Sequence, residues 1–401
     1  MHKVVIAIDT FKGCLSSIEA EKAATEGILS VFPECDIISL PIADGGEGML
    51  DVLIAATQGK SITAYAHDPL MERRETRYGI SGDGQTAFIE MANISGLPLV
   101  AVEQRNPMLT TSYGTGELIF DALERGCRNF IIGLGGSATN DAGSGMLQAL
   151  GFRFLNKEGN ELGNITKDNP THPTGKVING MCGQLISEVV SIDFSSIHPA
   201  LKESHFTAAC DVKNPFYGLN GAAYIFAPQK GADEKMVQEL DKGLEHIANI
   251  IRKETGRDIS VYPGAGAAGG MGGGMLAFLR AELKPGIELL LNVLNFKEQI
   301  KGANLIITGE GKSDRQTLMG KVPFGILREA QKQHIPVILL AGSVEDCGLF
   351  SHAGFQGIFS ITPSPLSLEQ AMEPSFARMN IKRTVEQICR ILAINDAICS
   401  K

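Results

Sequence analysis

A buried strand that leads into a glycine-rich turn most constrains the fold of this chain. The run from Asn129 to Leu134 is apolar and partly β-branched, which suits a strand covered on both faces. The turn follows, with glycines at 133, 135 and 136, and a helix is expected to continue to about Leu150. Strand, tight turn and helix in this order form the repeating unit of α/β folds. An α/β protein is therefore expected.

The same turn is a candidate anion site. Glycines let backbone N–H groups approach a ligand closely, and a helix start offers unpaired N–H groups at the positive end of its dipole. Asn140 adds a neutral polar group, and Asp141 adds a carboxylate that could hold Mg²⁺. A tight turn before a capped helix explains the pattern equally well, because such turns are common. Both interpretations stay open on the motif alone.

Length and charge limit the possible classes of protein. The chain has 401 residues, which is more than one hydrophobic core usually organises, so two domains are expected. The formal charge of −9 argues against nucleic acid or an anionic membrane as a partner. The sequence has no apolar run of roughly 18 residues and no CxxC pair among its eight cysteines. We expect a cytoplasmic protein with reduced thiols.

The two ends of the chain are typical of two halves of one sheet. Strands are expected at 3–8 and 36–40 near the N-terminus, and at 305–308, 337–340 and 357–361 near the C-terminus. Joined, they make one doubly wound sheet of about five parallel strands. We therefore expect a discontinuous α/β domain formed by residues 1–62 and 288–401. A second α/β domain, 63–287, is expected to be inserted in it.

Polar loops follow several predicted strands. Asp9 and Lys12 follow the first strand, Asp44 and Glu47 the second, and Asp211 the strand at 206–210. Ligands of open α/β sheets bind at the carboxyl ends of the strands, so these side chains are candidates for contact with metal or phosphate. For any one of them, a cap or turn residue on a solvated edge is the simpler explanation.

The segment 263–274 contains seven glycines in twelve residues. Ordering each of them costs backbone entropy, roughly half to one kcal/mol more than alanine within regular structure. A ligand that approaches the backbone would explain this composition, with Gly264, Gly266 and Gly269 as contacts. Close packing or a hinge between domains is the alternative.

Known templates exclude some chemistry and leave three classes. Gly311-Lys312-Ser313 is not a Walker A loop, because Ile306 stands where the template requires glycine. The spacings Gly133-x-Gly135-x-x-Ala138 and Gly264-x-Gly266-x-x-Gly269 match a dinucleotide fingerprint, but no second strand carries the expected acidic residue. Glycine turns, lysines and aspartates at strand ends favour phosphoryl transfer. A nicotinamide-dependent oxidoreductase and a non-catalytic nucleotide-binding module are the alternatives.

Six motifs, in order and spacing along essentially the whole chain, resemble the bacterial glycerate kinase family, type I. They are Asp9-Thr10-Phe11-Lys12-Gly13, the loop 43–48, the turn 133–141, Asp211-Val212-x-Asn214-Pro215, the run 263–270 and the loop 308–314. The family often has Arg where this chain has Lys312, a change that keeps the charge but loses bidentate geometry.

The resemblance implies ATP-dependent phosphorylation of D-glycerate with Mg²⁺, on two α/β domains with a cleft between them, one of them flavodoxin-like. Many members of the family make 2-phosphoglycerate, in the breakdown of glucarate, galactarate and glyoxylate. The alternatives are 3-phosphoglycerate as the product and, less favoured, a nicotinamide-dependent oxidoreductase. Whether the protein forms a homodimer is left open.

Physical reasoning then assigns expected roles to individual residues. The ATP phosphates are expected on the turn 133–140 or on the run 264–270, with Lys12 or Lys312 neutralising charge. Arg315 and Lys312 are the candidates for the glycerate carboxylate, and Asp314 or Asp44 for the general base. The expected ligands of Mg²⁺ are Asp44, Asp141 and Asp211. The nucleotide contacts are expected to be Gly133, Gly135, Gly136, Ser137, Asn140, Gly264, Gly266 and Gly269.

Overall fold

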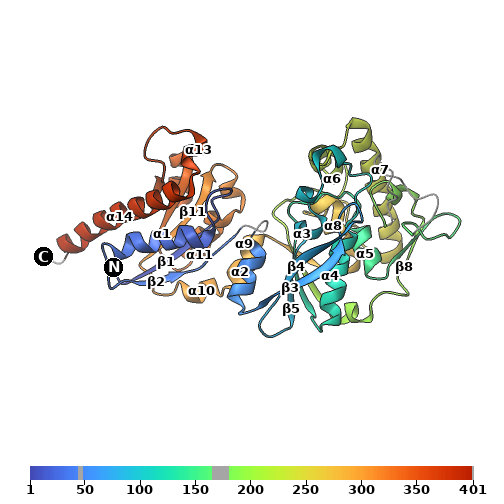
Figure 1. The fold of residues 1–401 in the computed structure, drawn as a ribbon, viewed down its shortest axis with the longest axis horizontal. Coiled ribbons are helices and arrows are strands. Elements are labelled where there is room, and N and C mark those ends of the chain that lie inside the picture. Colours follow the sequence, from blue (N-terminus) through green and yellow to red (C-terminus); the bar gives the residue numbers. More distant parts are fainter. Residues whose placement is uncertain (44–47, 165–179, 400–401) are drawn as a thin grey trace. The chain divides into compact units, whose positions relative to one another are not determined.

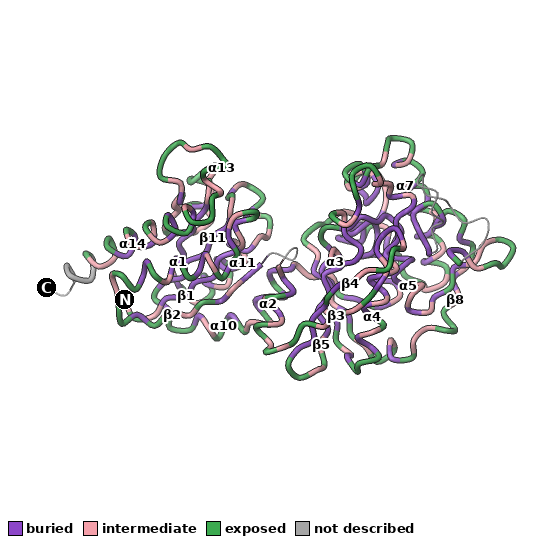
Figure 2. The backbone as a smooth tube through the Cα atoms, in the orientation of Figure 1, coloured by how far each residue is buried: buried purple, intermediate pink, exposed green. Residues whose placement is uncertain are grey.

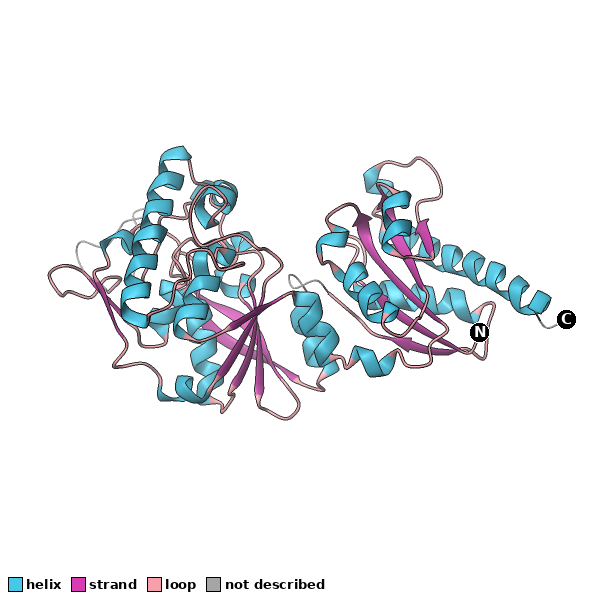
Figure 3. Cartoon of the chain, turned by 180° about the vertical axis from the view of Figure 1, so that it is seen from behind, coloured by secondary structure: helices cyan, strands magenta, loops and turns pink. Residues whose placement is uncertain are grey.

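The chain divides into two compact units. The computed structural model describes residues 1–43, 48–164 and 180–399, with side chains through residue 394. The first unit consists of Met1–Asp44 and Ile287–Lys401, and the second of Gly45–Gly286. Each unit has its own sheet with helices packed against it (Figures 1 and 3). Both are α/β structures, as the sequence predicts.

The first unit is a doubly wound parallel sheet. Its spatial order is β13-β12-β11-β1-β2, and every neighbouring pair is parallel. Counted along the unit's own chain this order is 2-1-3-4-5, the flavodoxin-like arrangement. The prediction of one five-stranded sheet from both chain ends is confirmed. The strands are β1 (Lys3–Ile8), β2 (Asp36–Ser39), β11 (Leu305–Ser313), β12 (Val337–Val344) and β13 (Gly357–Ser360).

Helices cover both faces of this sheet, because alternate residues of each strand point to opposite sides. Ile6 and Ile307 pack with helices α1 (Ser17–Leu29) and α14 (Pro374–Cys399). Val5 and Ile306 pack on the other face. The helices there are α9 (Gly286–Val293), α10 (Phe296–Gln299), α11 (Val322–Gln331) and α12 (Cys347–Ala353). The burial of β1 and β11 on both faces is visible in Figure 2.

The second unit has a mixed six-stranded sheet of order β10-β9-β6-β5-β4-β3. Strands β5, β6, β9 and β10 are parallel, and β3 and β4 are antiparallel additions at one edge. The sequence predicts strands at 61–66, 75–80 and 86–91, with a hairpin turn at 81–84, and the structure confirms all three. The bounds are β3 (Lys60–His67), β4 (Arg73–Ile80), β5 (Thr86–Glu90), β6 (Asn129–Gly133), β9 (His205–Ala209) and β10 (Glu282–Lys284).

Strand β10 lies at the end of the segment 275–283, for which the sequence pattern predicts a helix. The helix ends at Phe278, and Arg280 has a left-handed φ of 53° that turns the chain into the sheet. Three residues at a sheet edge carry too little periodicity to be recognised from sequence.

The boundary between the units also lies earlier than the predicted residue 62. Helix α2 (Met49–Ala56) belongs to the second unit, because Leu50 donates its N–H to the Glu90 carboxylate (2.8 Å). Gly79 of β4 packs against Ile54 of the same helix.

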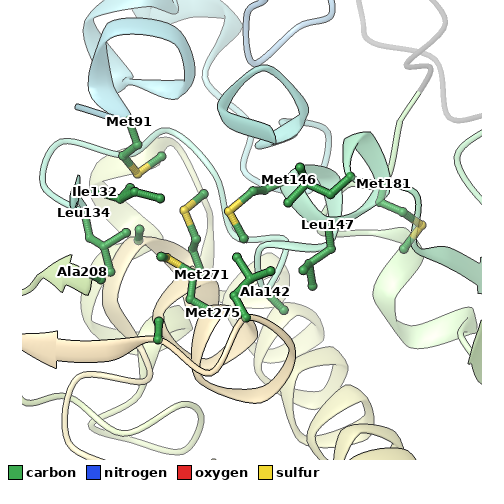
Figure 4. Close-up of a cluster of buried hydrophobic side chains, with 14 of the residues drawn as sticks. Met91, Ile132, Leu134, Ala142, Met146, Leu147, Met181, Ala208, Met271 and Met275 are labelled. Atoms are coloured by element: carbon green, nitrogen blue, oxygen red, sulfur yellow. The ribbon is translucent and has the colours of Figure 1, made fainter. Parts of the chain in front are cut away.

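A single large core holds the second unit together. Phe130 and Phe206 stack with their ring centroids 4.6 Å apart. The same core contains several buried methionines, together with Ile132 of β6. Figure 4 shows Met146, Met271 and Met275 in this core. The main helices of this core are α4 (Tyr113–Glu124), α5 (Ser144–Ala149), α6 (Ala222–Phe226), α7 (Glu234–Thr255) and α8 (Ala267–Phe278).

The smaller elements of the second unit complete its outline. They are helix α3 (Ala92–Ser95) and strands β7 (Arg153–Leu155) and β8 (Ser191–Asp193), which pair with each other. In the part of the chain that the structure describes, no helix is both long and apolar enough to cross a bilayer.

Candidate functional site

The loops after β1 and β11 lie side by side at the carboxyl edge of the first sheet. Asp9 donates its backbone N–H to the Gly309 carbonyl (2.9 Å), and a Cβ on Gly311 would lie 3.7 Å from the Cα of Phe11. Strand β1 has its chain neighbour β2 on one side and β11 on the other, so the winding direction changes here. Open α/β sheets bind ligands at this point.

Most of the charged residues predicted for catalysis lie on these two loops or, like Lys312, at the end of β11. Lys312 and Asp314 form an ion pair of 3.5 Å, and Arg315 and Lys12 are exposed. Desolvation opposes ionisation of Asp314, but the Gln316 N–H and the charges of Lys321 and Lys312 still lower its pKa. Asp314 is therefore a carboxylate at neutral pH. Asp44 and Glu47 lie outside the described residues.

Glu310 organises the β11 loop, although sequence reasoning gave it no role. It is 5% exposed, and its carboxylate accepts hydrogen bonds from the hydroxyls of Ser313 (2.9 Å) and Thr317. Lys321 lies 3.8 Å away. Burial raises the pKa of Glu310. Its position inside the motif 308–314 was the only sequence signal that could have singled it out.

In the second unit, most backbone N–H groups of the turn after β6 have no acceptor among the described residues. Leu134 donates to the Ala209 carbonyl and Ala138 to the Ser95 carbonyl, and both bonds anchor the turn. Within the described residues, no hydrogen bond is donated by the backbone N–H groups of Gly135, Gly136, Ser137, Thr139 or Asn140. Unpaired N–H groups in a turn are what an anion-binding loop requires.

Buried side chains next to this turn also lack partners. Thr139, Asn140 and Ser144 are at most 1% exposed. Among the described residues, nothing bonds to the hydroxyls of Thr139 and Ser144 or to either polar atom of the Asn140 amide. Such groups are rare in proteins, and a bound ligand, ion or water commonly satisfies them.

Lys230 is a residue of this region that the sequence analysis missed. Its ammonium group donates to the Ser137 hydroxyl (2.7 Å) and to the Thr139 carbonyl (2.7 Å). Its side chain is buried, and burial lowers its pKa to about 7. It stands in the unremarkable segment Pro228-Gln229-Lys230, more than ninety residues from the turn that it contacts, so no local pattern could reveal the contact.

Asp141 has a different environment from that of a typical Mg²⁺ ligand. It is fully buried, and its oxygens accept bonds from the Ser112 N–H (2.8 Å), the Ser112 hydroxyl (2.7 Å) and the N–H groups of Gly143 and Gly145. These donors lie at the starts of α4 and α5, so the carboxylate ties two helices together. This geometry weighs against the predicted metal role and supports the capping interpretation.

The glycine run 263–274 is explained by packing rather than by a ligand. An added Cβ would lie 2.3 Å from the Pro215 carbonyl oxygen at Gly266 and 2.0 Å from the Thr139 carbonyl oxygen at Gly269. At Gly264 it would lie 3.0 Å from the Cys210 sulfur. The whole run 264–270 is buried within the second unit. The predicted nucleotide contacts at Gly264, Gly266 and Gly269, and the predicted hinge, therefore find no support in this geometry.

Asp211 remains a candidate metal ligand. It follows β9, the strand next to β6, and is exposed, with its carboxylate accepting the Gly286 N–H (2.9 Å). Among the described residues there is no cluster of three or more His, Cys, Asp or Glu side chains that could hold a metal. This does not conflict with Mg²⁺, which usually takes one or two carboxylates together with substrate phosphates and water.

Comparison with known proteins identifies the family. The model of the glycerate kinase family matches residues 4–393. The chain belongs to the glycerate kinase family. Glycerate 2-kinase of Escherichia coli K12 is 47% identical and a glycerate kinase of Bacillus cereus is 45% identical, each over 98% of both chains.

A solved structure agrees with this assignment. A crystal structure from Salmonella typhimurium LT2, provisionally assigned as glycerate kinase 2, superimposes with a TM-score of 0.86 at 39% identity. The match covers 99% of both chains. The predicted family, enzyme class and fold class are confirmed, and the kinase class prevails over the oxidoreductase and binding-module alternatives. The individual site residues stay predictions.

Proposed function

We propose that this glycerate kinase family member transfers the γ-phosphoryl group of ATP to the 2-hydroxyl of D-glycerate, giving 2-phosphoglycerate. The relative from Escherichia coli is named for 2-kinase activity and matches nearly the whole chain. The observation that carries the proposal for this chain is the turn 135–140, in which five backbone N–H groups have no acceptor among the described residues, while that of Ala138 anchors the turn to Ser95. A nucleotide phosphate supplies the acceptors that this turn lacks.

The two units then offer complementary chemistry. In the second unit, the turn 135–140 would bind phosphate oxygens and hold them in place by backbone donors. In the first unit, Lys12, Lys312 and Arg315 are cations suited to the glycerate carboxylate and to developing charge. Asp314, ionised at neutral pH, is the proposed acceptor of the hydroxyl proton, with Asp44 as the alternative.

Mg²⁺ fits the residues present, with a narrower set of ligands than the sequence suggested. Asp211 has an exposed carboxylate at a strand end, whereas the oxygens of Asp141 are already occupied by protein donors. We propose Asp211 as the residue of the second unit that would hold the ion, and Asp44, outside the described residues, stays a candidate from the sequence alone. Bound there, Mg²⁺ would neutralise phosphate charge. We also propose that the protein is cytoplasmic and that it phosphorylates a small molecule.

A direct assay tests the reaction and its regiochemistry. The protein is incubated with ATP, Mg²⁺ and D-glycerate, and enolase is then added while phosphoenolpyruvate is followed by its ultraviolet absorbance. Absorbance that rises only with all three reactants supports the 2-phosphate. ADP formation with no signal from enolase would instead indicate the 3-phosphate. No ADP formation with D-glycerate would refute the proposal.

Single substitutions test the assigned roles. Asp314→Asn is expected to lower kcat at least a hundredfold, since general-base catalysis typically contributes on the order of 10²–10⁴ in rate. If Asp44 is the base instead, Asp44→Asn shows this loss. Asp346→Asn is a suitable control, because Asp346 is an exposed cap of α12 in the same unit. Near-normal kcat in both test variants would overturn the assignment of the base.

A further inference from the structure

Lys230 is an unusual lysine because it is buried without an ion-pair partner. It is 2% exposed and ends the short 3₁₀ helix Pro228–Lys230. Lysine is almost never fully buried unless it is paired. Among the ion pairs of the described residues, none includes Lys230, and the nearest compensating charge is that of the buried Asp141. Burying a charge without an ion-pair partner destabilises the folded protein, so stability does not explain Lys230.

The two contacts of Lys230 determine which hydrogen-bond donors the turn 135–140 offers to a ligand. An ammonium group can only donate, so the Ser137 hydroxyl oxygen must accept from it, and the hydroxyl hydrogen is left to point elsewhere. Within the described residues, the Ser137 hydroxyl donates to no acceptor. Ser137 thus becomes a donor available to an anion.

The second contact acts on the backbone. Lys230 holds the Thr139 carbonyl (2.7 Å), and in a planar trans peptide the following N–H points in the opposite direction. The N–H of Asn140 is therefore directed away from Lys230, and among the described residues it has no acceptor. The second contact thus presents a donor on the side of the turn that does not face the lysine, and the first leaves the Ser137 hydroxyl hydrogen available.

We propose that Lys230 is a positioning residue for anion binding, which orients the Ser137 hydroxyl and the Asn140 N–H toward a phosphate of the nucleotide. This inference rests on the proposed function, in which the turn 135–140 binds ATP. Burial disfavours the charged lysine in the free protein, as its lowered pKa shows, and an anion nearby would favour it. The buried charge thus gains stabilisation only when ligand is present.

The test compares ligand affinity with stability in Lys230→Met. Methionine keeps the length and apolar stem of lysine but removes the donor and the buried charge. We expect Kd and KM for ATP to rise about tenfold or more, because a charge-assisted contact network is lost, with D-glycerate affinity unchanged. The thermal unfolding midpoint of the ligand-free protein should stay the same or rise, since a buried charge is replaced by an apolar group.

Two further variants complete the experiment. Lys230→Arg restores the charge and should recover part of the ATP affinity. Lys235→Met, which removes an 85%-exposed lysine of the same unit, should leave both affinities unchanged. Unchanged ATP affinity in Lys230→Met would overturn the inference while leaving the kinase proposal intact, and so would weakening confined to D-glycerate. If wild-type protein forms no ADP with D-glycerate, the proposed function itself has failed.

Discussion

At the scale of single residues, the surroundings of a carboxylate decide its role. Asp141 is buried under backbone and hydroxyl donors and links helices, whereas Asp314 is held ionised beside lysines at a strand end. Glu21 of α1 is a third case, since it is 2% exposed and has one carboxyl oxygen with no partner among the described residues. The three are indistinguishable as acidic residues in a sequence.

Replacing Asp141 by Asn should destabilise the folded protein rather than only lower kcat. The substitution removes a charged acceptor that binds donors at the starts of α4 and α5. We expect the free energy of unfolding to fall by about 2–4 kcal/mol, measured by urea denaturation without Mg²⁺. Asp211→Asn, at an exposed position, should cost less than about 1 kcal/mol. Unchanged stability with a large loss of kcat would restore the metal role for Asp141.

Glu21 should make stability depend on pH. Burial raises its pKa to about 8, with the Ile8 N–H opposing the shift. Between its usual pKa of 4.5 and about 8, the folded protein keeps a proton that the unfolded chain releases. The stabilising contribution is therefore complete below the lower value and is lost as pH rises through the higher one, at most by about 1.4 kcal/mol per unit.

The neutral variant Glu21→Gln checks this dependence. Urea unfolding at pH 5 to 8 should show a smaller loss of stability with rising pH in the variant than in the wild type. Glu26→Gln, an exposed position on the same helix, serves as the control. Parallel pH profiles for Glu21→Gln and wild type would contradict the prediction.

At the scale of elements, two left-handed turns pack against each other beneath the candidate phosphate turn. Ala142 and Gly143 have φ of 57° and 73°, and residues 268–270 form a second left-handed segment at the start of α8. Ala142 donates its N–H to the Gly269 carbonyl (3.0 Å). The glycines of 263–274 therefore allow two backbones to touch, which fixes the end of the turn 133–141.

Gly269→Ala tests this packing against a matched control. Gly269 and Gly256 have similar left-handed φ of 65° and 72°, but only at Gly269 would a Cβ meet the Thr139 carbonyl oxygen at 2.0 Å. Gly256 ends α7 with nothing within 4 Å of its Cβ position. We expect Gly256→Ala to cost about 1 kcal/mol and Gly269→Ala at least about 2 kcal/mol more. Equal costs in urea denaturation would refute the packing argument.

At the scale of the whole molecule, the first unit is assembled from both chain ends, and the sequence of the second unit lies between them. Its central strand β11 pairs with β1, from Leu305 opposite Val4 to Gly309 opposite Ile8. These strands belong to the first unit. Three of its five strands come from the C-terminal segment. The N-terminal segment alone can bury only a fraction of its apolar residues. Independent folding of the two units as domains stays a prediction.

Truncation after Gly286 should separate the two units. The shortened chain loses β11, β12 and β13, so residues 1–44 retain only the β1–β2 pair and should be cut rapidly by trypsin. Residues 45–286 keep a complete sheet and core and should resist digestion. Mass spectrometry of a digestion time course identifies the fragments. Rapid loss of the 45–286 fragment would show that the second unit depends on the first.

The sequence alone predicted the fold class and most elements, because strand composition, capping boxes and glycine turns are local signals. The Ser-x-x-Glu spacing of Ser16 and Glu19 predicts a capping box at a helix start, and the structure has it. The five parallel strands and the hairpin turn at 81–84 are also present. The family resemblance, spread over six motifs, gave the enzyme class.

Only the tertiary structure decided which polar groups are satisfied. Asp141 and the run 263–274 were predicted to contact ligands, yet their partners lie in distant segments, such as Ser112 and Thr139. Lys230 was missed for the same reason, since no residue near it in the sequence indicates a contact with Ser137. Hydrogen bonds and close contacts between distant segments depend on how elements pack, and no local pattern of residues encodes that packing.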